Sequence, residues 1–324
     1  MSRRSPRIRE FPARTLEAID GARYDAALAS LGFEMRCREI PAAIGTPADA
    51  TVIPFGDRHV LDYRKNEAWF REHSWKEVEL EEEQIVSWTA NWLAGLSSGH
   101  AESVRIAIDV SSMNRLRIGA VIEAMLSLPL DARAEVDLLY TPAQFEVPDQ
   151  SEDPQVFDVT PVSDYFAGWW TDLGAPLVAV IGVGYELEMA ASAIDKLEPE
   201  GTIVFTPNGE DARYAKEVAR ANVALMQPAK VGRQPYEVAD PFGCFGLLET
   251  TLAKLEQRFR VAFVPLGPKI FAACAMLAAG LHPDTSQVIR VTTGSRGTAV
   301  NRRSNGKLCG LTVLINPPPG EQER

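Results

Sequence analysis

Apolar residues along the chain fall into short runs that alternate with amphipathic stretches. Runs rich in Val, Ile and Leu predict buried strands, and apolar residues every three or four positions predict helices. The predicted strands are Ala50–Phe55, Val104–Val110, Ala134–Tyr140, Val156–Val159, Leu177–Ile181, Thr202–Thr206, Arg260–Val264 and Gln287–Thr293. The predicted helices are Leu80–Leu93, Leu116–Leu126, Glu186–Leu197, Asp211–Asn222, Phe245–Arg258 and Lys269–Leu281. This alternation indicates an α/β fold with parallel sheets that are covered on both faces.

The clearest predicted helix is Leu80–Leu93. Its first turn carries three consecutive glutamates, which suit the positive end of a helix dipole, and Gly95 follows as a stop signal. Ile85, Trp88 and Trp92 recur at helical spacing, so we expect them to form one apolar stripe in the core.

The order of elements repeats at an offset of about 152 residues. Gly32-Phe33-Glu34 is echoed by Gly184-Tyr185-Glu186, and the strand ending at Ile53 is echoed by one ending at Phe205. Ala124-Met125-Leu126 is echoed by Ala275-Met276-Leu277. Self-similarity in this order predicts two tandem Rossmann-like units related by internal duplication. The alternative is one long doubly wound sheet with coincidental echoes.

Composition shifts suggest where the units begin and end. We expect a basic arm at 1–19, a first unit at 20–147, a linker at 148–164, a second unit at 165–316 and a tail at 317–324. The linker starts with Pro148–Pro154, which has two prolines, three acidic residues and no large apolar residue.

The overall charge and cysteine content exclude several classes of protein. The net charge of −11 argues against an extended duplex nucleic-acid interface, and the four cysteines form no CxxC pair. Cys244 and Cys274 fall in apolar helical segments, so we expect buried thiols. The absence of a long apolar run predicts a cytoplasmic protein without a membrane span.

The loop from Asp109 to Arg115 is the first candidate site. It follows an apolar strand and opens a helix, where free backbone N–H groups attract anions. Ser111 and Ser112 offer hydroxyls, and Arg115 and Arg117 could pair with phosphate. Equally, Ser112 could cap the helix while the arginines face solvent.

The equivalent loop of the second half is Pro265-Leu-Gly-Pro-Lys269. Gly267 allows close approach of the backbone, and an exposed Lys269 would place an ammonium group over a bound phosphate. An ordinary helix start is an equal alternative. No GxxxxGK[ST] motif is present, which argues against ATP hydrolysis of the P-loop class.

A third candidate is Ile181-Gly-Val-Gly-Tyr-Glu186, which includes Gly182 and Gly184. It partly matches a dinucleotide or S-adenosylmethionine fingerprint but has no third glycine, so a methyltransferase is a minor hypothesis. Glu34 and Glu186 could contact a ribose or a base edge, or could pair with local arginines such as Arg36.

Basic and aromatic residues outside these loops are further candidates. Arg64 and Arg296 are basic residues that we place on loops, Tyr63 and Tyr185 could stack on a base, and Arg302–Lys307 is read as a hairpin turn. No pair of histidines has metal-ligand spacing, and no GxSxG or HExxH motif is present. We therefore assign no metal and no cofactor.

Two tandem Rossmann-like units, each with a small-residue loop ending in Lys or Arg before a helix, resemble the CRISPR-associated Rossmann fold (CARF) and its tandem relative, the SAVED domain. The loops that carry the resemblance are Asp109–Arg115 and Leu266–Lys269. It implies a sensor of cyclic or linear oligonucleotide second messengers in bacterial antiviral defence. Such proteins often carry an effector domain, and none is recognisable here, so either the effector is a separate protein or the resemblance is to the fold alone.

We therefore expect a nucleotide-binding or nucleotide-sensing module whose ligand lies in a cleft shared by both units. The alternative is an enzyme that acts on a phosphorylated nucleotide or sugar in that cleft, with Asp109, Glu34 or Glu186 as general acid or base. A homo-oligomer is compatible with either hypothesis.

Overall fold

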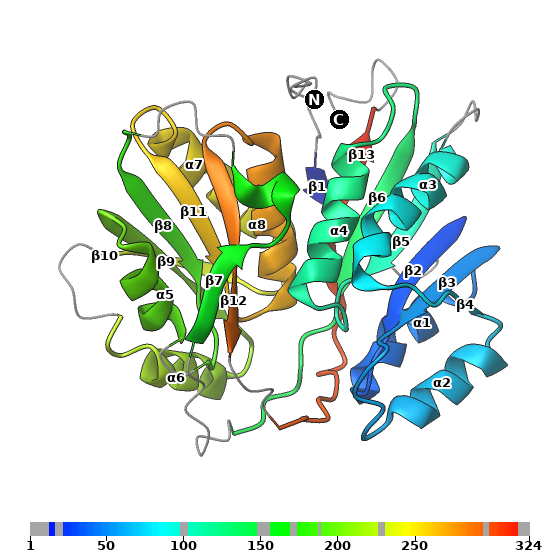
Figure 1. Ribbon diagram of the computed structural model, residues 1–324. Helices are drawn as coiled ribbons and strands as arrows, with labels where there is room; N and C mark the ends of the chain where they lie inside the picture. The colour runs from blue at the N-terminus through cyan, green and yellow to red at the C-terminus, as the bar shows by residue number, and fades with distance from the viewer. Residues whose placement is uncertain are drawn as a thin grey trace.

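The computed structural model describes residues 13–16, 22–97, 103–147, 156–168, 174–186, 189–225, 231–293 and 298–316. Two mostly parallel sheets stand side by side with helices between them and on their outer faces (Figure 1). The strand order is β1-β13-β6-β5-β2-β3-β4 in the first sheet and β10-β9-β8-β11-β12-β7 in the second. The chain is thus an α/β protein built from two tandem Rossmann-like units.

The first unit takes its elements mainly from the first half of the chain. Its strands are β1 (Ala13–Thr15), β2 (Ala26–Leu31), β3 (Asp49–Pro54), β4 (Lys76–Glu77), β5 (Val104–Asp109), β6 (Ala134–Tyr140) and β13 (Cys309–Ile315). Its helices are α1 (Glu39–Ile44), α2 (Tyr63–Glu72), α3 (Ile85–Ser97) and α4 (Arg115–Leu126), with short 3₁₀ turns η1 (Met35–Arg38) and η2 (Glu82–Gln84).

The second unit repeats this order. Its strands are β7 (Val156–Pro161), β8 (Leu177–Gly182), β9 (Gly201–Asn208), β10 (Val231–Glu237), β11 (Arg260–Pro265) and β12 (Ser286–Thr293). Its helices are α5 (Met189–Leu197), α6 (Ala212–Ala221), α7 (Pro241–Leu255) and α8 (Lys269–Leu281), with the 3₁₀ turn η3 (Asp164–Ala167) after β7.

Internal duplication accounts for the matching strand orders. In each sheet the first parallel strand of the unit, β2 or β8, lies in the middle, with the next two strands on one side and the last two on the other. Gly32 directly follows β2, and Gly184 lies two residues after β8. The Ala-Met-Leu echo is out of register, because Ala124 lies nine residues after the start of α4 (124 − 115) but Ala275 only six after the start of α8 (275 − 269).

The two units exchange their sixth strands. β7 follows the first unit in the chain but pairs antiparallel with β12, whereas β13 follows the second unit and pairs antiparallel with β6. This corrects the predicted boundaries: 309–315 belongs to the first sheet, β7 lies inside the predicted linker, and β1 lies inside the predicted basic arm. All seven residues of β13 are buried, which requires a place inside a sheet, between β1 and β6.

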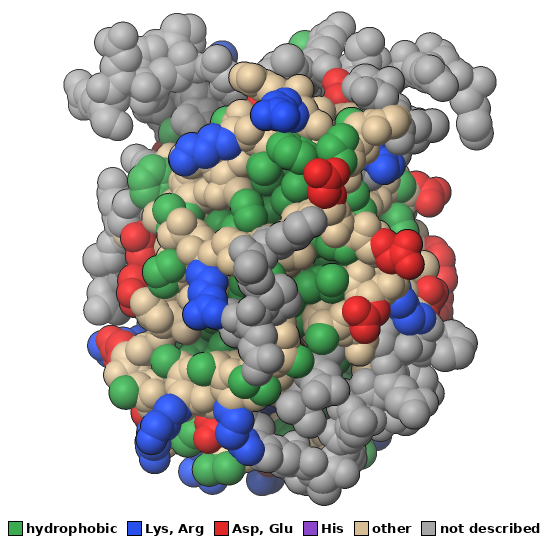
Figure 2. Space-filling view, turned by 90° about the vertical axis from the view of Figure 1, so that its left-hand side faces the viewer, with side chains coloured by type: hydrophobic (Ala, Val, Ile, Leu, Met, Phe, Trp, Pro, Cys, Tyr) green, Lys and Arg blue, Asp and Glu red, His purple; other side chains and the backbone are tan. Residues whose placement is uncertain are grey.

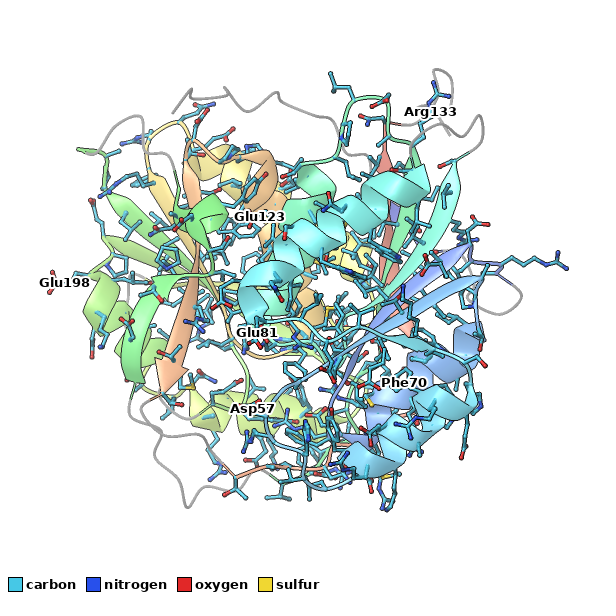
Figure 3. All side chains as sticks on the ribbon, turned by 45° about the vertical axis from the view of Figure 1, so that its right-hand side comes forward. Asp57, Phe70, Glu81, Glu123, Arg133 and Glu198 are labelled. Atoms are coloured by element: carbon cyan, nitrogen blue, oxygen red, sulfur yellow. The ribbon has the colours of Figure 1, made fainter. Side chains whose placement is uncertain are left out.

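One hydrophobic core joins the units. It lies between the sheets and includes residues of α4 and α8, such as Ile118 and Met276, together with inward-facing residues of β6 and β11. Two smaller cores lie on the outer faces; that of the first unit includes Phe70 of α2, whose ring lies between the helix and the sheet (Figure 3). Glu123 of α4, labelled in the same view, accepts a hydrogen bond from Ser163 Oγ at 2.9 Å across the unit boundary.

Several predicted elements differ from the structure. The helix predicted at Leu80–Leu93 begins at Ile85, because the backbone N–H of Glu81 donates to Gln84 Oε1 at 3.0 Å and the acidic residues form the preceding turn. Gly95 lies inside this helix. Arg64, which we placed on a loop, lies in α2. The strand β10 was not predicted, because its sequence VGRQPYE has no apolar run.

On the outer face of the second unit, basic and acidic side chains are interspersed rather than gathered into a single-sign patch (Figure 2). All four cysteines are buried and free, Cys244 and Cys274 in helices as the sequence predicts. Within the described residues, no helix is both long and apolar enough to cross a bilayer.

Candidate functional site between the two units

The helices α4 and α8 begin with basic residues that reach across the unit boundary. Lys269 Nζ donates to the carbonyl oxygen of Ser111 at 2.8 Å, and Arg115 Nε donates to the carbonyl oxygen of Pro265. Ser111 lies four residues before Arg115 in the first unit, and Pro265 lies four residues before Lys269 in the second. The two contacts are therefore equivalent by the internal duplication, and they bring the two predicted loops together.

Glycines allow the loops of the second unit to approach each other. Gly267 has a φ of +73°, a conformation that side chains rarely adopt. A Cβ on Gly184 would lie 2.5 Å from the Cα of Gly267, so neither position accepts a larger residue without movement. Asn222 Nδ2 donates to the carbonyl oxygen of Gly184 at 2.9 Å and fixes this loop from below.

A cleft of about 1080 Å³ opens above these loops. It lies between the carboxyl ends of the second sheet and the 140–147 and 298–309 segments, which pack on the first unit. This is the place where parallel α/β sheets bind ligands. Its basic lining residues are Arg36, Arg115, Arg220, Lys269, Arg290, Arg302 and Lys307.

Most charges around the cleft are already paired. Arg36 Nε lies 2.5 Å from Glu34 Oε2, and Lys307 is paired with Glu210. Arg115 Nη2 lies 3.4 Å from the Gly267 carbonyl oxygen and 3.9 Å from Glu186 Oε1. Arg302 differs: its side chain is exposed and makes no hydrogen bond or ion pair with a described residue.

Lys269 is partly buried, not exposed as the sequence suggested. Burial lowers the pKa of Lys269 to about 7; Glu34 opposes the shift, and nearby arginines, including Arg36 and Arg302, reinforce it. Burial alone would raise the pKa of Glu34, but Arg36 and Lys269 hold it below its ordinary value. A phosphate beside Lys269 would favour its charged form and relieve the crowding of positive charge.

Aromatic rings form one wall of the cleft. Tyr185 packs edge-on against Tyr214, with ring centroids 4.7 Å apart, and Phe145 lies 6.4 Å from Tyr185. Tyr185 Oη and Glu186 Oε2 are buried atoms without a hydrogen-bond partner among the described residues. Such atoms are costly to leave unpaired, so they mark positions where a ligand could supply donors or acceptors.

Other predicted site residues lie beneath the cleft and do not line it. Burial raises the pKa of Asp109 to about 6, although its Oδ1 accepts from the backbone N–H of Ser111 at 2.8 Å. Ser111 Oγ accepts from the backbone N–H of Thr141 at 3.0 Å, and Ser112 is buried. Asn114, rather than Ser112, caps α4. A carboxylate near pKa 6 could move a proton at neutral pH, but this one does not face the cleft.

Arg117 and Gly182 have structural surroundings. The guanidinium of Arg117 is buried on the face of the first sheet, where it donates to the carbonyl oxygens of Ile53 and Pro54 at 2.9 and 2.8 Å. Gly182 makes room for the ring of Phe271, which is packed against it. Arg296 lies outside the described residues.

Sequence reasoning missed several residues of the cleft. Tyr214 lies in a predicted helix and Arg302 in a predicted hairpin turn, and Phe145 received no assignment beyond the first unit. Arg290 carried a signal that could have been used, because it is a lone charge inside the apolar run Val288–Val291. Tyr63, by contrast, is buried and stacks on His59 with ring centroids 3.9 Å apart.

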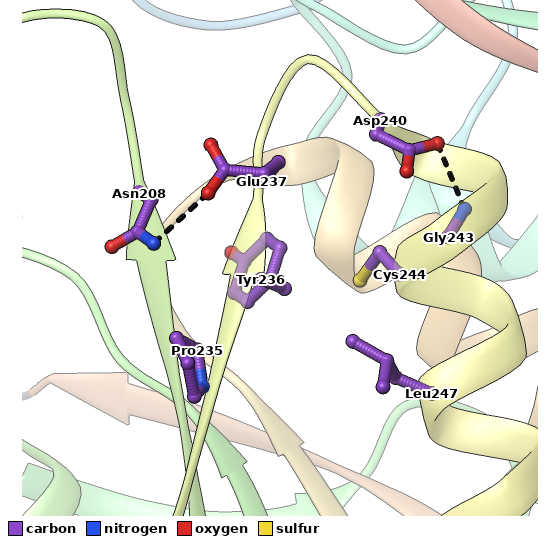
Figure 4. A pocket seen from close by; sticks show the side chains of 8 residues that line it. All are labelled: Asn208, Pro235, Tyr236, Glu237, Asp240, Gly243, Cys244 and Leu247. Carbon is purple, nitrogen blue, oxygen red and sulfur yellow. Dashed lines mark hydrogen bonds between the residues drawn. The ribbon is translucent and has the colours of Figure 1, made fainter.

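A second, smaller hollow of about 370 Å³ lies between the ends of β9 and β10 and the start of α7 (Figure 4). Asn208 Nδ2 donates to Glu237 Oε1 at 3.0 Å, and Asp240 caps α7 by accepting from the backbone N–H of Gly243 at 2.9 Å. Its charged lining residues are both acidic, so it is unsuited to a phosphate. No three His, Cys, Asp or Glu side chains in the described part of the chain converge on a metal-binding arrangement.

Comparisons with known proteins add little to this picture. No family model matches the chain, and no curated protein matches it. One solved structure that aligns with it is the functionally unknown protein PA1789 from Pseudomonas aeruginosa PAO1, at 11% identity and a TM-score of 0.25. The alignment covers 84% of this chain and 92% of that one. A similarity of this strength carries no argument about function, which must come from the cleft itself.

Proposed function

We propose that the protein binds a phosphorylated nucleotide in the cleft between its two units. The observation that carries the proposal is the combination of Lys269 and Arg302 with an aromatic wall at the carboxyl ends of parallel strands. The cationic groups suit a phosphate, and the rings of Tyr185 and Tyr214 suit a base.

A binding role agrees better with the carboxylates than catalysis does. Glu34 and Glu186 lie beside arginines, and Asp109 lies below the cleft, so none is poised as a general acid or base on a ligand. Glu186 Oε2 is placed to accept a hydrogen bond from a ribose hydroxyl or a base amino group. The resemblance to the CARF and SAVED families extends the proposal to a cyclic oligonucleotide messenger, sensed on behalf of a separate effector.

Lys269→Met tests the proposal directly. We expect it to weaken nucleotide binding by about 1.5–3 kcal/mol, the range for a hydrogen bond to a charged group, while the fold is retained. Arg302→Met should weaken binding as well. Calorimetry with AMP, ATP, cyclic di-AMP and cyclic tri-AMP, after a thermal-shift screen of the same panel, measures both effects.

Arg303→Met is the matched control, because Arg303 is the exposed neighbour of Arg302 and does not line the cleft. It should bind as the unmodified protein does. If no nucleotide in the panel binds, or if the Lys269 and Arg302 variants bind as tightly as the control, the proposal is wrong.

A further inference from the structure

Arg290 is a basic residue of the cleft whose position follows from strand geometry. Side chains alternate along β12, so Arg290 shares a face with Val288, which packs in the core between the two sheets. Ile289 and Val291 point to the opposite face and pack on the outer core of the second unit. Arg290 therefore projects towards the first unit, at the β12 end of the cleft.

Among the residues that the structure describes, none forms a hydrogen bond or an ion pair with the guanidinium of Arg290. Its Nε is buried without a hydrogen bond to any described residue, and no ion pair holds it. Arg115 lines the same cleft but differs from Arg290, because its guanidinium donates hydrogen bonds to the carbonyl oxygens of Pro265 and Gly267. A buried N–H of a cationic group is costly unless an acceptor faces it, and a bound anion is the acceptor that best suits arginine.

The size of the cleft leaves room for more than one anionic group. Its volume of about 1080 Å³ is at the upper end of the range for small-molecule pockets, roughly 300–1,000 Å³. Lys269 and Arg302 lie together, because both act on the pKa of Glu34. Arg290 lies on β12, which β11 separates from β8 and from the Tyr185 loop that follows β8, so Arg290 lies at the β12 end of the cleft, away from that loop.

We propose that Arg290 forms a second anion subsite of the cleft, so that the ligand carries two phosphate groups separated by a nucleoside. The first phosphate lies at Lys269 and Arg302, and the second pairs with Arg290. This inference rests on the proposed function and goes beyond it, because it assigns a second phosphate of the ligand to Arg290.

The experiment compares two probes, AMP with one phosphate and the linear dinucleotide pApA with two. Calorimetry should show that the unmodified protein binds pApA more tightly than AMP. Arg290→Met should weaken pApA binding about tenfold or more and leave AMP binding within about twofold, since AMP does not reach the second subsite. Arg290→Lys, which keeps the charge without the forked geometry, should give an intermediate loss.

Arg258→Met is the control, because Arg258 is exposed on the same unit, just before β11, and far from the strand ends that form the cleft. It removes one positive charge and should leave both affinities unchanged. If Arg290→Met weakens both probes equally, or neither, the second subsite is wrong while nucleotide binding stands. If the unmodified protein binds neither probe, the proposed function fails and the subsite fails with it.

Discussion

The strand-end loops of the two units differ in what fills them. In the first unit, Asp109 and Arg117 are buried below the cleft and form hydrogen bonds within the protein, and Arg36, which lines the cleft, is paired with Glu34. In the second unit, glycines at 184 and 267 let the two loops approach closely, and Tyr185 and Glu186 face the cleft with polar atoms that have no partner among the described residues. In the first unit, the protein's own charged side chains thus occupy the space at the strand ends, whereas in the second unit this space is part of the cleft.

Equivalent helix positions show the same contrast. Arg117 and Phe271 each lie two residues after the first residue of their helix, α4 or α8. Arg117 donates to backbone carbonyls of the first sheet, while Phe271 fills the equivalent space against Gly182 of the second. A basic residue at a strand end is therefore weak evidence for a ligand site until its burial is known.

The largest effect on stability should come from removing the buried charge of Arg117 in the first unit. Arg117→Met removes the guanidinium that donates to the carbonyl oxygens of Ile53 and Pro54, and we expect a loss of about 3–5 kcal/mol in the free energy of unfolding. Urea denaturation at neutral pH measures this loss. A stable Arg117→Met protein that no longer binds nucleotide would reverse the comparison, because it would make Arg117 a ligand residue.

A smaller effect should separate the two equivalent glycines. Gly184→Ala places a methyl group against the backbone of Gly267, and we expect a loss of about 1–3 kcal/mol from overpacking. Gly32→Ala is the matched control, since its added Cβ would meet nothing closer than 3.9 Å. Thermal unfolding of both variants checks the difference, and equal stabilities would contradict the idea that only the second loop needs glycine.

The effect that depends on pH concerns Asp109, the last residue of β5, where the corresponding strand β11 ends with Pro265. Burial raises the pKa of Asp109 to about 6 in the folded protein, whereas the pKa of an unfolded aspartate is about 3.9. Between about pH 3.9 and pH 6 the folded state therefore binds a proton on the Asp109 carboxyl more strongly than the unfolded state does. Stability should therefore fall as pH rises through this window, by at most about 1.4 kcal/mol per pH unit.

Asp109→Asn should remove this part of the slope, because the amide oxygen can still accept from Ser111 but does not titrate. Urea midpoints between pH 4 and pH 7 make the comparison with the unmodified protein. Identical slopes would show that Asp109 is not held in its protonated form by burial.

The comparison also explains what the sequence could and could not reveal. The order of elements and the echo of Gly32 by Gly184 predict two Rossmann-like units, because hydrophobic periodicity is a local property. Lys269 and Arg115 were placed at helix starts correctly. Arg117 was grouped with Arg115, but a separation of two residues turns it by about 200° around the helix, so that it faces the sheet.

Pairing of edge strands was the part of the fold that local pattern could not predict. Val156–Val159 was predicted as a strand, yet nothing in its residues shows that it joins β12 instead of β6. That choice depends on how the two sheets face each other. The same holds for Arg302 and Tyr214, which share the cleft only because segments distant in sequence meet there.

The exchanged strands set the order in which the molecule can be completed. During synthesis, the segment up to Tyr140 emerges long before Cys309–Ile315, and until then β6 has an unpaired edge that invites wrong partners. Pairing of β13 with β6 joins residues that are far apart in the chain, and proteins of high contact order fold slowly. The first unit therefore cannot be cut out as one continuous segment, because its sheet includes Cys309–Ile315, whereas all six strands of the second sheet lie within residues 156–293.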